Sequence, residues 1–276
     1  MFDLHVHAAP DIWPRHGGDL ATVTAYARAG FTGCVLKGHY ESTVGRAAAA
    51  AEVTGLAVFG GIALNRHVGG INAAAVAATL AQGGRVVWFP TSDAHAQHAA
   101  GLPRLCGQHP ELSPLSYGIP PVNPETADEV TRICELIAEA DAVLATGHLS
   151  TAEIGWLLPV AARHGVRRVL LTHPGYTVPA MPAETAREFA SAGALVEITT
   201  FQLLHQHGAS AAWLAEYART VGVDRVVLSS DAGQPDSPPP PEALVLLQET
   251  LAAQGIDPGS LRSAASERAA ELVMPG

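Results

Sequence analysis

The sequence predicts an α/β protein folded as a (β/α)8 TIM barrel, with a long loop after the fourth strand and allowance for distortion. Three observations lead to this fold class. Eight short apolar runs recur along the chain, alanine-rich helical segments lie between them, and most runs begin about 24 to 31 residues apart. Alternating strands and helices at this spacing are typical of parallel strands joined by helical crossovers, and eight such units can close into a barrel.

Each apolar run is continuous rather than alternating, as expected for a strand that is buried on both faces of a parallel sheet. The first run begins almost at once, at Phe2, and contains the pattern His5-Val6-His7. The predicted strands are Phe2–His7, Gly33–Lys37, Ala57–Ile62, Arg85–Phe89, Ala142–Gly147, Arg168–Thr172, Ala194–Ile198 and Arg225–Ser230.

Helices fit between these strands, and several carry end signals. Asp19 can cap the first helix, which stops at Gly30. Asn123 can cap a later helix that has Pro124 in its first turn. The predicted helices are Asp19–Ala29, Glu41–Thr54, Asn72–Gln82, Pro124–Ala140, Ser150–His164, Pro182–Ala192, Ser210–Val221, Pro241–Gln254 and Asp257–Leu272.

The gap between the fourth and fifth strands is nearly twice as long as the others. The extra chain, Thr91–Val122, is rich in Pro, Gly, His and Ser. A long segment of this kind in a compact domain is often an active-site lid, and a surface insertion is the alternative.

The composition is that of a globular protein. The chain has 276 residues, 48% of them hydrophobic and 15% charged, with a formal net charge of -10. We expect one domain over residues 1–276 and a small-molecule substrate. Nucleic-acid binding is not expected, because it depends on Lys and Arg that neutralise phosphates. A homo-oligomer is compatible with the sequence.

The location expected from the sequence is the cytoplasm. Cys34, Cys106 and Cys134 stand far apart and form no C-x-x-C pair, which favours reduced thiols. No apolar stretch approaches the length of a membrane span, and the first residues lack the pattern of a signal peptide.

Polar and titratable residues follow the predicted strands, at the end of a barrel where active sites lie. His5 and His7 are two apart on a strand, so their rings share one side, and Asp3 shares it too. His148 and Asp231 each come directly after an apolar run. A lone His or Asp at such a position is more often structural, but the joint pattern favours a metal site. A second H-x-H pair, at residues 205 and 207, is read as chance.

This arrangement resembles the amidohydrolase superfamily, through H-x-H on strand one, His on strands five and six, and Asp on strand eight. The resemblance implies that His5, His7 and Asp231 bind a first metal. It implies that His148 and His173 bind a second metal, or that His148 joins the first while His173 contacts the substrate. Asp231 would also shuttle protons.

One residue departs from that pattern. Two-metal members of the superfamily usually carry a carboxylated Lys or a Glu on strand four, and strand four here, RVVWFPTSDA, has neither. Lys37, at the end of strand two, is the one Lys in the chain. It could be carboxylated and bridge two metals, hold an anionic substrate as a cation, or act as a Schiff-base nucleophile.

A second family is also similar. The opening DLHVH and the stretch Lys37-Gly38-His39 look like the start of the polymerase-and-histidinol-phosphatase phosphoesterases. The strand-three Glu of that family is missing, and SSDAG lacks its closing His. The resemblance to this phosphoesterase family ranks second, and under this interpretation His39 becomes a stronger candidate for a site residue.

The implied activity is hydrolysis by a metal-activated water that attacks a small amide, lactone or ester. The cofactor would be one or two divalent ions, with Zn first and Mn, Ni or Fe as alternatives. Asp231, His173 and Lys37 would be catalytic. A phosphoesterase, a lyase such as a decarboxylase, and an inactive barrel used as a scaffold are the alternatives.

Substrate binding is expected from the loops after the strands. Arg66 follows strand three and could pair with a carboxylate or a phosphate. Tyr40 and His39 follow strand two. Further candidates are Thr91, His95, His98, Trp13 and Arg15.

Overall fold

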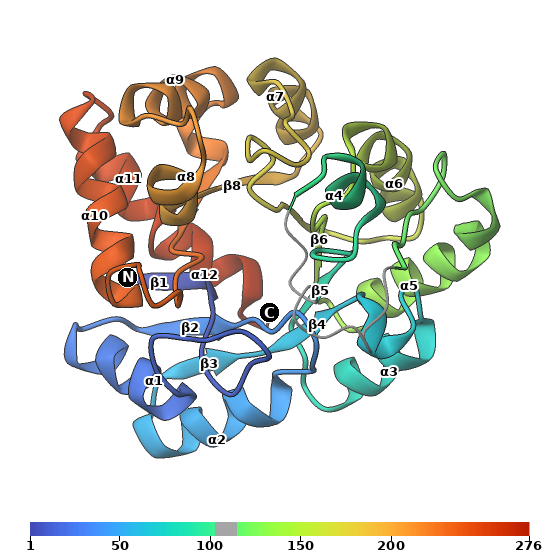
Figure 1. Cartoon of the computed structure of the whole chain (residues 1–276), viewed down its shortest axis with the longest axis horizontal. Coiled ribbons are helices and arrows are strands. Elements are labelled where there is room, and N and C mark those ends of the chain that lie inside the picture. Colours follow the sequence, from blue (N-terminus) through green and yellow to red (C-terminus); the bar gives the residue numbers. More distant parts are fainter. Residues whose placement is uncertain (103–114, 276) are drawn as a thin grey trace.

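Parallel strands occupy the centre of the molecule, and helices surround them (Figure 1). The computed structural model describes residues 1–102 and 115–275. Within these ranges the strands form two parallel sheets, ordered β1-β2-β3 and β4-β5-β6-β7-β8-β9. The strands are β1 (Phe2–Val6), β2 (Gly33–Leu36), β3 (Ala57–Phe59), β4 (Gly61–Ala63), β5 (Val86–Trp88), β6 (Val143–Ala145), β7 (Arg168–Leu171), β8 (Leu195–Thr199) and β9 (Val226–Ser229).

β3 and β4 are two parts of the predicted third strand, divided at Gly60. Thr43 lies at this division. Its hydroxyl donates to the carbonyl of Leu36 (2.7 Å) and accepts from the amide of Gly61 (3.0 Å). A Cβ atom at position 60 would collide with the backbone of Thr43. The Thr43 hydroxyl therefore links the end of β2 to the start of β4. This link keeps the ring of strands continuous where β2 and β4 do not pair directly.

The other junction, between β9 and β1, closes the ring. Val6 forms a parallel bridge with Ala232, and the amide of His7 donates to the Ala232 carbonyl (2.8 Å). The amide of Asp231 donates to the carbonyl of His5 (2.8 Å). With β3 and β4 counted as one, the described strands make a distorted eight-stranded barrel, which confirms the predicted fold class.

A bulge in β1 turns Asp3 away from the histidines. Asp3 pairs with Cys34 and Val6 pairs with Leu36, so three steps along β1 match two along β2. The prediction that Asp3 shares the side of His5 and His7 is wrong for this reason. Its carboxylate instead accepts from Tyr26 Oη on the first helix, and from the amides of His5 (3.1 Å) and Ser230 (3.0 Å).

The helices pack around the strands much as predicted, and two short ones were not expected. These are α4 and α8, which follow β5 and β8. The helices are α1 (Asp19–Arg28), α2 (Val44–Thr54), α3 (Ala73–Ala81), α4 (His95–Ala99), α5 (Ala127–Glu139), α6 (Thr151–Arg163), α7 (Ala183–Ser191), α8 (Thr200–His205), α9 (Ala211–Val221), α10 (Pro240–Ala253), α11 (Pro258–Ala264) and α12 (Glu267–Val273).

Two predicted caps are wrong. Gly18, not Asp19, is the N-cap of α1, because the Asp19 carboxylate binds Arg46 on α2 (2.6 Å). Asn123 makes no side-chain cap, and Pro124 opens a 3₁₀ turn that leads into α5. In both places a tertiary contact or a tighter turn replaces the local capping bond.

The last helix closes the barrel at the end opposite the candidate site. Leu272 and Val273 of α12 join a buried cluster with strand residues such as Phe2 and Trp88. Arg85, next to the start of β5, donates from Nε to the carbonyl of Val273 (2.7 Å). The predicted closing helix is thus two helices, and the second one plugs the barrel.

The segment predicted as a lid is described only in part. Its beginning forms α4, whereas residues 103–114, with Cys106, lie outside the described residues. Cys34 and Cys134 are buried free thiols. Among the described residues, no helix has the length and apolar character needed to cross a membrane.

Candidate metal and substrate site

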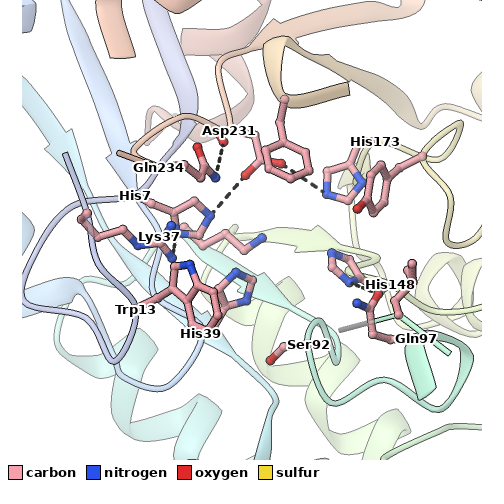
Figure 2. A pocket seen from close by; sticks show the side chains of 14 residues that line it. His7, Trp13, Lys37, His39, Ser92, Gln97, His148, His173, Asp231 and Gln234 are labelled. Atoms are coloured by element: carbon pink, nitrogen blue, oxygen red, sulfur yellow. Dashed lines mark hydrogen bonds and ion pairs between the residues drawn. The ribbon is translucent and has the colours of Figure 1, made fainter. Parts of the chain in front are cut away.

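A cavity of about 270 Å³ opens at the carboxyl ends of the strands (Figure 2). Every residue that was predicted as a metal ligand lies at this cavity or directly beside it. The residues that line it are His7, Trp13, Arg15, Lys37, His39, Ser92, Gln97, Leu102, His148, His173, Tyr176, Phe201, Asp231 and Gln234.

His5, His7 and Asp231 form the centre of the site. The Nε2 atoms of His5 and His7 lie 3.0 and 3.2 Å from the same oxygen, Asp231 Oδ1. The three residues come from β1 and from the turn after β9, which the backbone bonds between these strands hold together. Asp231 has a positive φ of 48°, a conformation that Asp tolerates better than most residues. Donor atoms this close together can share one cation.

Glu197, on β8, fixes the orientation of His5. Its Oε1 accepts from His5 Nδ1 (3.1 Å) and from Ser229 Oγ (2.7 Å), and its Oε2 accepts from the amide of His173 (3.1 Å). In the neutral ring the proton of His5 therefore lies on Nδ1, and the Nε2 lone pair is directed towards Asp231 and Lys37. Glu197 has no role among the residues predicted from the sequence. A carboxylate inside the apolar run ALVEITT was the signal that could have identified it.

Lys37 reaches the same centre from the end of β2. Its Nζ lies 2.9 Å from His5 Nε2 and 5.7 Å from the ring centroid of Trp88, which forms an apolar floor. Burial lowers the pKa of Lys37 to about 8, so part of the amine is neutral near neutral pH. The structure thus places an amine beside a predicted metal ligand, whereas its carboxylation stays a prediction.

His148 and His173 lie next to each other at the cavity, with ring centroids 5.1 Å apart. His148 Nδ1 bonds to Gln97 Oε1 (3.2 Å), an acceptor that leaves the lone pair on Nε2. His173 Nε2 lies 3.8 Å from Asp231 Oδ2, and its buried Nδ1 has no hydrogen-bond partner among the described residues. An unpaired buried nitrogen is costly unless a ligand or an ion satisfies it.

The charges of the site are distributed unevenly. Burial alone would lower the pKa of His5, but Asp231 and Glu197 raise it above its ordinary value. Burial would raise the pKa of Asp231, yet His5 and the other histidines hold it well below the usual range. Burial lowers the pKa of His173 to about 4 and that of His148 well below its ordinary value. The lowered pKa values of His148, His173 and Asp231 favour neutral imidazoles and an ionised carboxylate, which are the forms that bind metal, whereas the raised pKa of His5 favours a proton that a metal would have to displace.

The predicted substrate-binding residues divide into two groups. His39, Trp13 and Arg15 line the cavity. Tyr40 and Arg66 are not among its lining residues. The Tyr40 hydroxyl donates to Asp93 Oδ1 (2.7 Å), and Arg66 Nη1 lies 3.5 Å from the Tyr117 hydroxyl. Their part in substrate binding stays a prediction.

Three further predicted residues, Thr91, His95 and His98, are not among those that line the cavity. Thr91 bonds to His39 Nδ1 (2.9 Å). His95 and His98 belong to α4, which contributes its Gln97 to the cavity instead.

A family model for a family of unknown function, DUF6282, matches residues 1–197 of the chain. The chain belongs to this family. A search of curated proteins finds no match for the DUF6282 chain.

Solved structures share its fold. An amidohydrolase from Pseudomonas aeruginosa is 13% identical, with 98% of this chain and 95% of that chain covered and a TM-score of 0.63. An organophosphorus hydrolase variant from Deinococcus radiodurans is 14% identical, with 99% and 93% covered and a TM-score of 0.57. A 2,6-dihydroxybenzoate decarboxylase is 11% identical, with 99% and 98% covered and a TM-score of 0.58. The predicted resemblance to amidohydrolases is confirmed at the level of the fold.

The residues of this DUF6282 chain fit a divalent cation. With bonds of about 2.1 Å, neighbouring ligand atoms on one ion lie about 3 Å apart, as they do between Asp231 Oδ1 and the two imidazoles. A second group, His5, His173 and Glu197, also has ligand atoms within 4.8 Å of one another. Because both Glu197 oxygens already accept hydrogen bonds, that residue is better suited to orienting ligands than to being one.

Proposed function

We propose that the protein is a metal-dependent hydrolase of small amides, lactones or esters. The observation that carries this proposal is the convergence of His5 Nε2 and His7 Nε2 on one oxygen of Asp231 at the edge of the cavity. Nitrogen and carboxylate ligands with an open side are typical of catalytic zinc sites. Zinc as the ion, with Mn, Ni or Fe as alternatives, one ion or two, a cytoplasmic location and a homo-oligomer belong to the proposal.

When bound, such an ion lowers the pKa of water towards neutrality and polarises an oxygen of the substrate. The chain supplies the proton transfers. Asp231 is ionised, so its carboxylate can accept the proton of water and pass it to the leaving group. The 3.8 Å distance between His173 Nε2 and Asp231 Oδ2 supports a contact of His173 with the same leaving group.

The cavity walls favour a compact substrate with an anionic group. Trp13, Tyr176 and Phe201 offer aromatic surface, and their rings can pack against an apolar portion of the substrate. Lys37 brings a cationic amine and Arg15 a guanidinium to the same cavity. An acidic group on the substrate would be stabilised by them, although Arg15 already binds Asp11 (2.7 Å).

Metal analysis of the full chain, purified without chelators, tests the proposal together with a panel of amides, lactones and esters. We expect bound Zn, Mn, Ni or Fe, and hydrolysis that chelation abolishes. His7→Ala and Asp231→Asn should lose both metal and activity. His164→Ala, at a partly exposed surface position, is the matched control and should keep both. Protein that binds no divalent ion would contradict the proposal.

A lyase that removes a carboxyl group is the second candidate. Lys37 places an amine where a substrate carboxylate could lie, and the fold is shared with a decarboxylase. Release of CO2 from aromatic and aliphatic carboxylates, without hydrolysis of any ester or lactone, would favour this reaction. Phosphomonoesters in the same panel test the phosphoesterase alternative.

A further inference from the structure

A buried hydrogen-bond network fixes the side chain of Asn65 in one orientation. Its Oδ1 accepts from the amides of Thr91 (2.9 Å) and Asp93 (3.3 Å). A backbone amide can only donate, so the oxygen and nitrogen of this side chain cannot be exchanged. Its Nδ2 therefore donates to the carbonyl of His39 (2.8 Å) and to Thr91 Oγ1 (2.6 Å).

The buried Thr91 hydroxyl also needs an acceptor for its own proton. Thr91 is completely buried and already accepts a hydrogen bond from Asn65. Among the described residues, the acceptor within reach of its hydroxyl is His39 Nδ1, at 2.9 Å. If His39 Nδ1 carried a proton instead, that hydroxyl would be left as a buried donor without an acceptor, an arrangement that folded proteins avoid.

His39 therefore accepts at Nδ1 and carries its proton on Nε2, the other edge of the ring. The ring stacks on His7, with centroids 4.9 Å apart and planes 16° apart, which holds its plane in place. Its Nδ1 edge faces the wall that holds Thr91, and His39 itself lines the cavity (Figure 2).

We propose that His39 is a catalytic residue, held as the Nε2–H tautomer, that donates a hydrogen bond to an oxygen of the substrate. This inference rests on the proposed function, since it gives the hydrolase a donor for the oxygen on which charge develops. The inference also describes the substrate, which would carry a carbonyl or carboxylate oxygen and bind with that oxygen near the metal ligands. A protonated Nε2 cannot ligate a metal, so His39 lies outside the metal-binding set.

The tautomer is tested by NMR on the full chain with ¹⁵N-labelled histidine, with the His39 signals assigned by their loss in His39→Gln. We expect a protonated Nε2 and an unprotonated Nδ1. Thr91→Ser keeps the hydroxyl and should keep the tautomer, whereas Thr91→Val should change the Nδ1 signal. A protonated Nδ1 in the natural chain, or no response to Thr91→Val in a variant that melts cooperatively, would overturn the inference.

Donation to a ligand is tested without turnover. Benzoate is the probe, because it offers a carboxylate on a ring that the aromatic walls can accept. It should shift the His39 Nε2–H signal in the natural chain. Saturation of the cavity is followed by the part of the tryptophan fluorescence change that Trp13→Phe abolishes. No shift of the His39 signal at saturating benzoate would overturn the donor role, even if the substrate panel had failed.

Kinetics and metal content complete the test. His39→Phe keeps an aromatic ring and removes the donor, so kcat should fall about 100-fold or more, KM should change much less than kcat, and the metal content should stay unchanged. His39→Gln offers an amide near the Nε2 position and should recover part of the loss. Loss of metal in His39→Phe would overturn the proposal, because it would make His39 a ligand. If no compound of the substrate panel were hydrolysed, the proposed function would be contradicted. The NMR experiments would still show whether His39 is held as the Nε2–H tautomer and donates to a ligand.

Discussion

Replacement of Glu197 by Gln tests whether the carboxylate behind His5 matters for metal binding. The change keeps the shape of the side chain and removes its charge. In the structure the two oxygens of Glu197 accept from three donors, which are His5 Nδ1, Ser229 Oγ and the amide of His173. An amide has one acceptor oxygen, so its NH2 group must face at least one of these donors.

The size of the effect follows from that mismatch. A buried donor without an acceptor costs about 1 to 3 kcal/mol, and the charge-assisted bond to His5 is lost as well. Changes behind a metal ligand lower metal affinity by about 10- to 100-fold. We therefore expect Glu197→Gln to lower the free energy of unfolding, measured in urea, by about 2 kcal/mol. We also expect it to lower the affinity for zinc by about 10- to 100-fold.

Urea denaturation and competition with a chromogenic chelator measure the two effects. Glu188→Gln, the same change at an exposed position on α7, is the control and should shift stability by less than about 0.5 kcal/mol. Unchanged zinc affinity in Glu197→Gln, with Glu188→Gln behaving as expected, would refute the idea that this carboxylate orients His5.

Two further predictions concern the scaffold. Hydrogen bonding from Arg168, aided by Arg167, lowers the pKa of Asp141 from 3.8 to about 2, so its stabilising effect is present above pH 3.8 and is lost as the pH falls towards 2. Its side chain is 26% exposed, so Asp141→Asn should cost about 1 kcal/mol at pH 7 in urea denaturation, and an equal cost at pH 2.5 would contradict this origin. Gly61→Ala should destabilise the barrel by several kcal/mol, because its Cβ would collide with the Val86 carbonyl. Gly45→Ala, in open space on α2, should be neutral or stabilising by up to about 1 kcal/mol in thermal melts, and equal losses in both variants would count against the collision.

The sequence predicted the ring of strands and the rim residues well because both depend on local patterns. A continuous apolar run indicates a buried strand, and a polar residue directly after it falls at the carboxyl end of the sheet. His5, His7, His148, His173 and Asp231 were found in this way, and the structure brings all five together.

What the sequence did not predict depends on contacts between distant segments. The bulge that turns Asp3 towards Tyr26 is a property of the pairing between β1 and β2, and strand alternation alone cannot indicate it. The division of the third strand depends on Thr43, which approaches Gly60 from another part of the chain. Glu197 gains its role from His5, 192 residues away.

The helix α12 links the order of synthesis to the order of folding. Its apolar side chains complete the interior that the strands share, and the arginine beside β5 binds its final turn. During synthesis, every candidate ligand is therefore in place in the chain before α12 is made and can cover the interior of the barrel. During that interval the inner faces of the strands lack the apolar cover that Leu272 and Val273 provide, and hydrophobic surface exposed in this way favours aggregation.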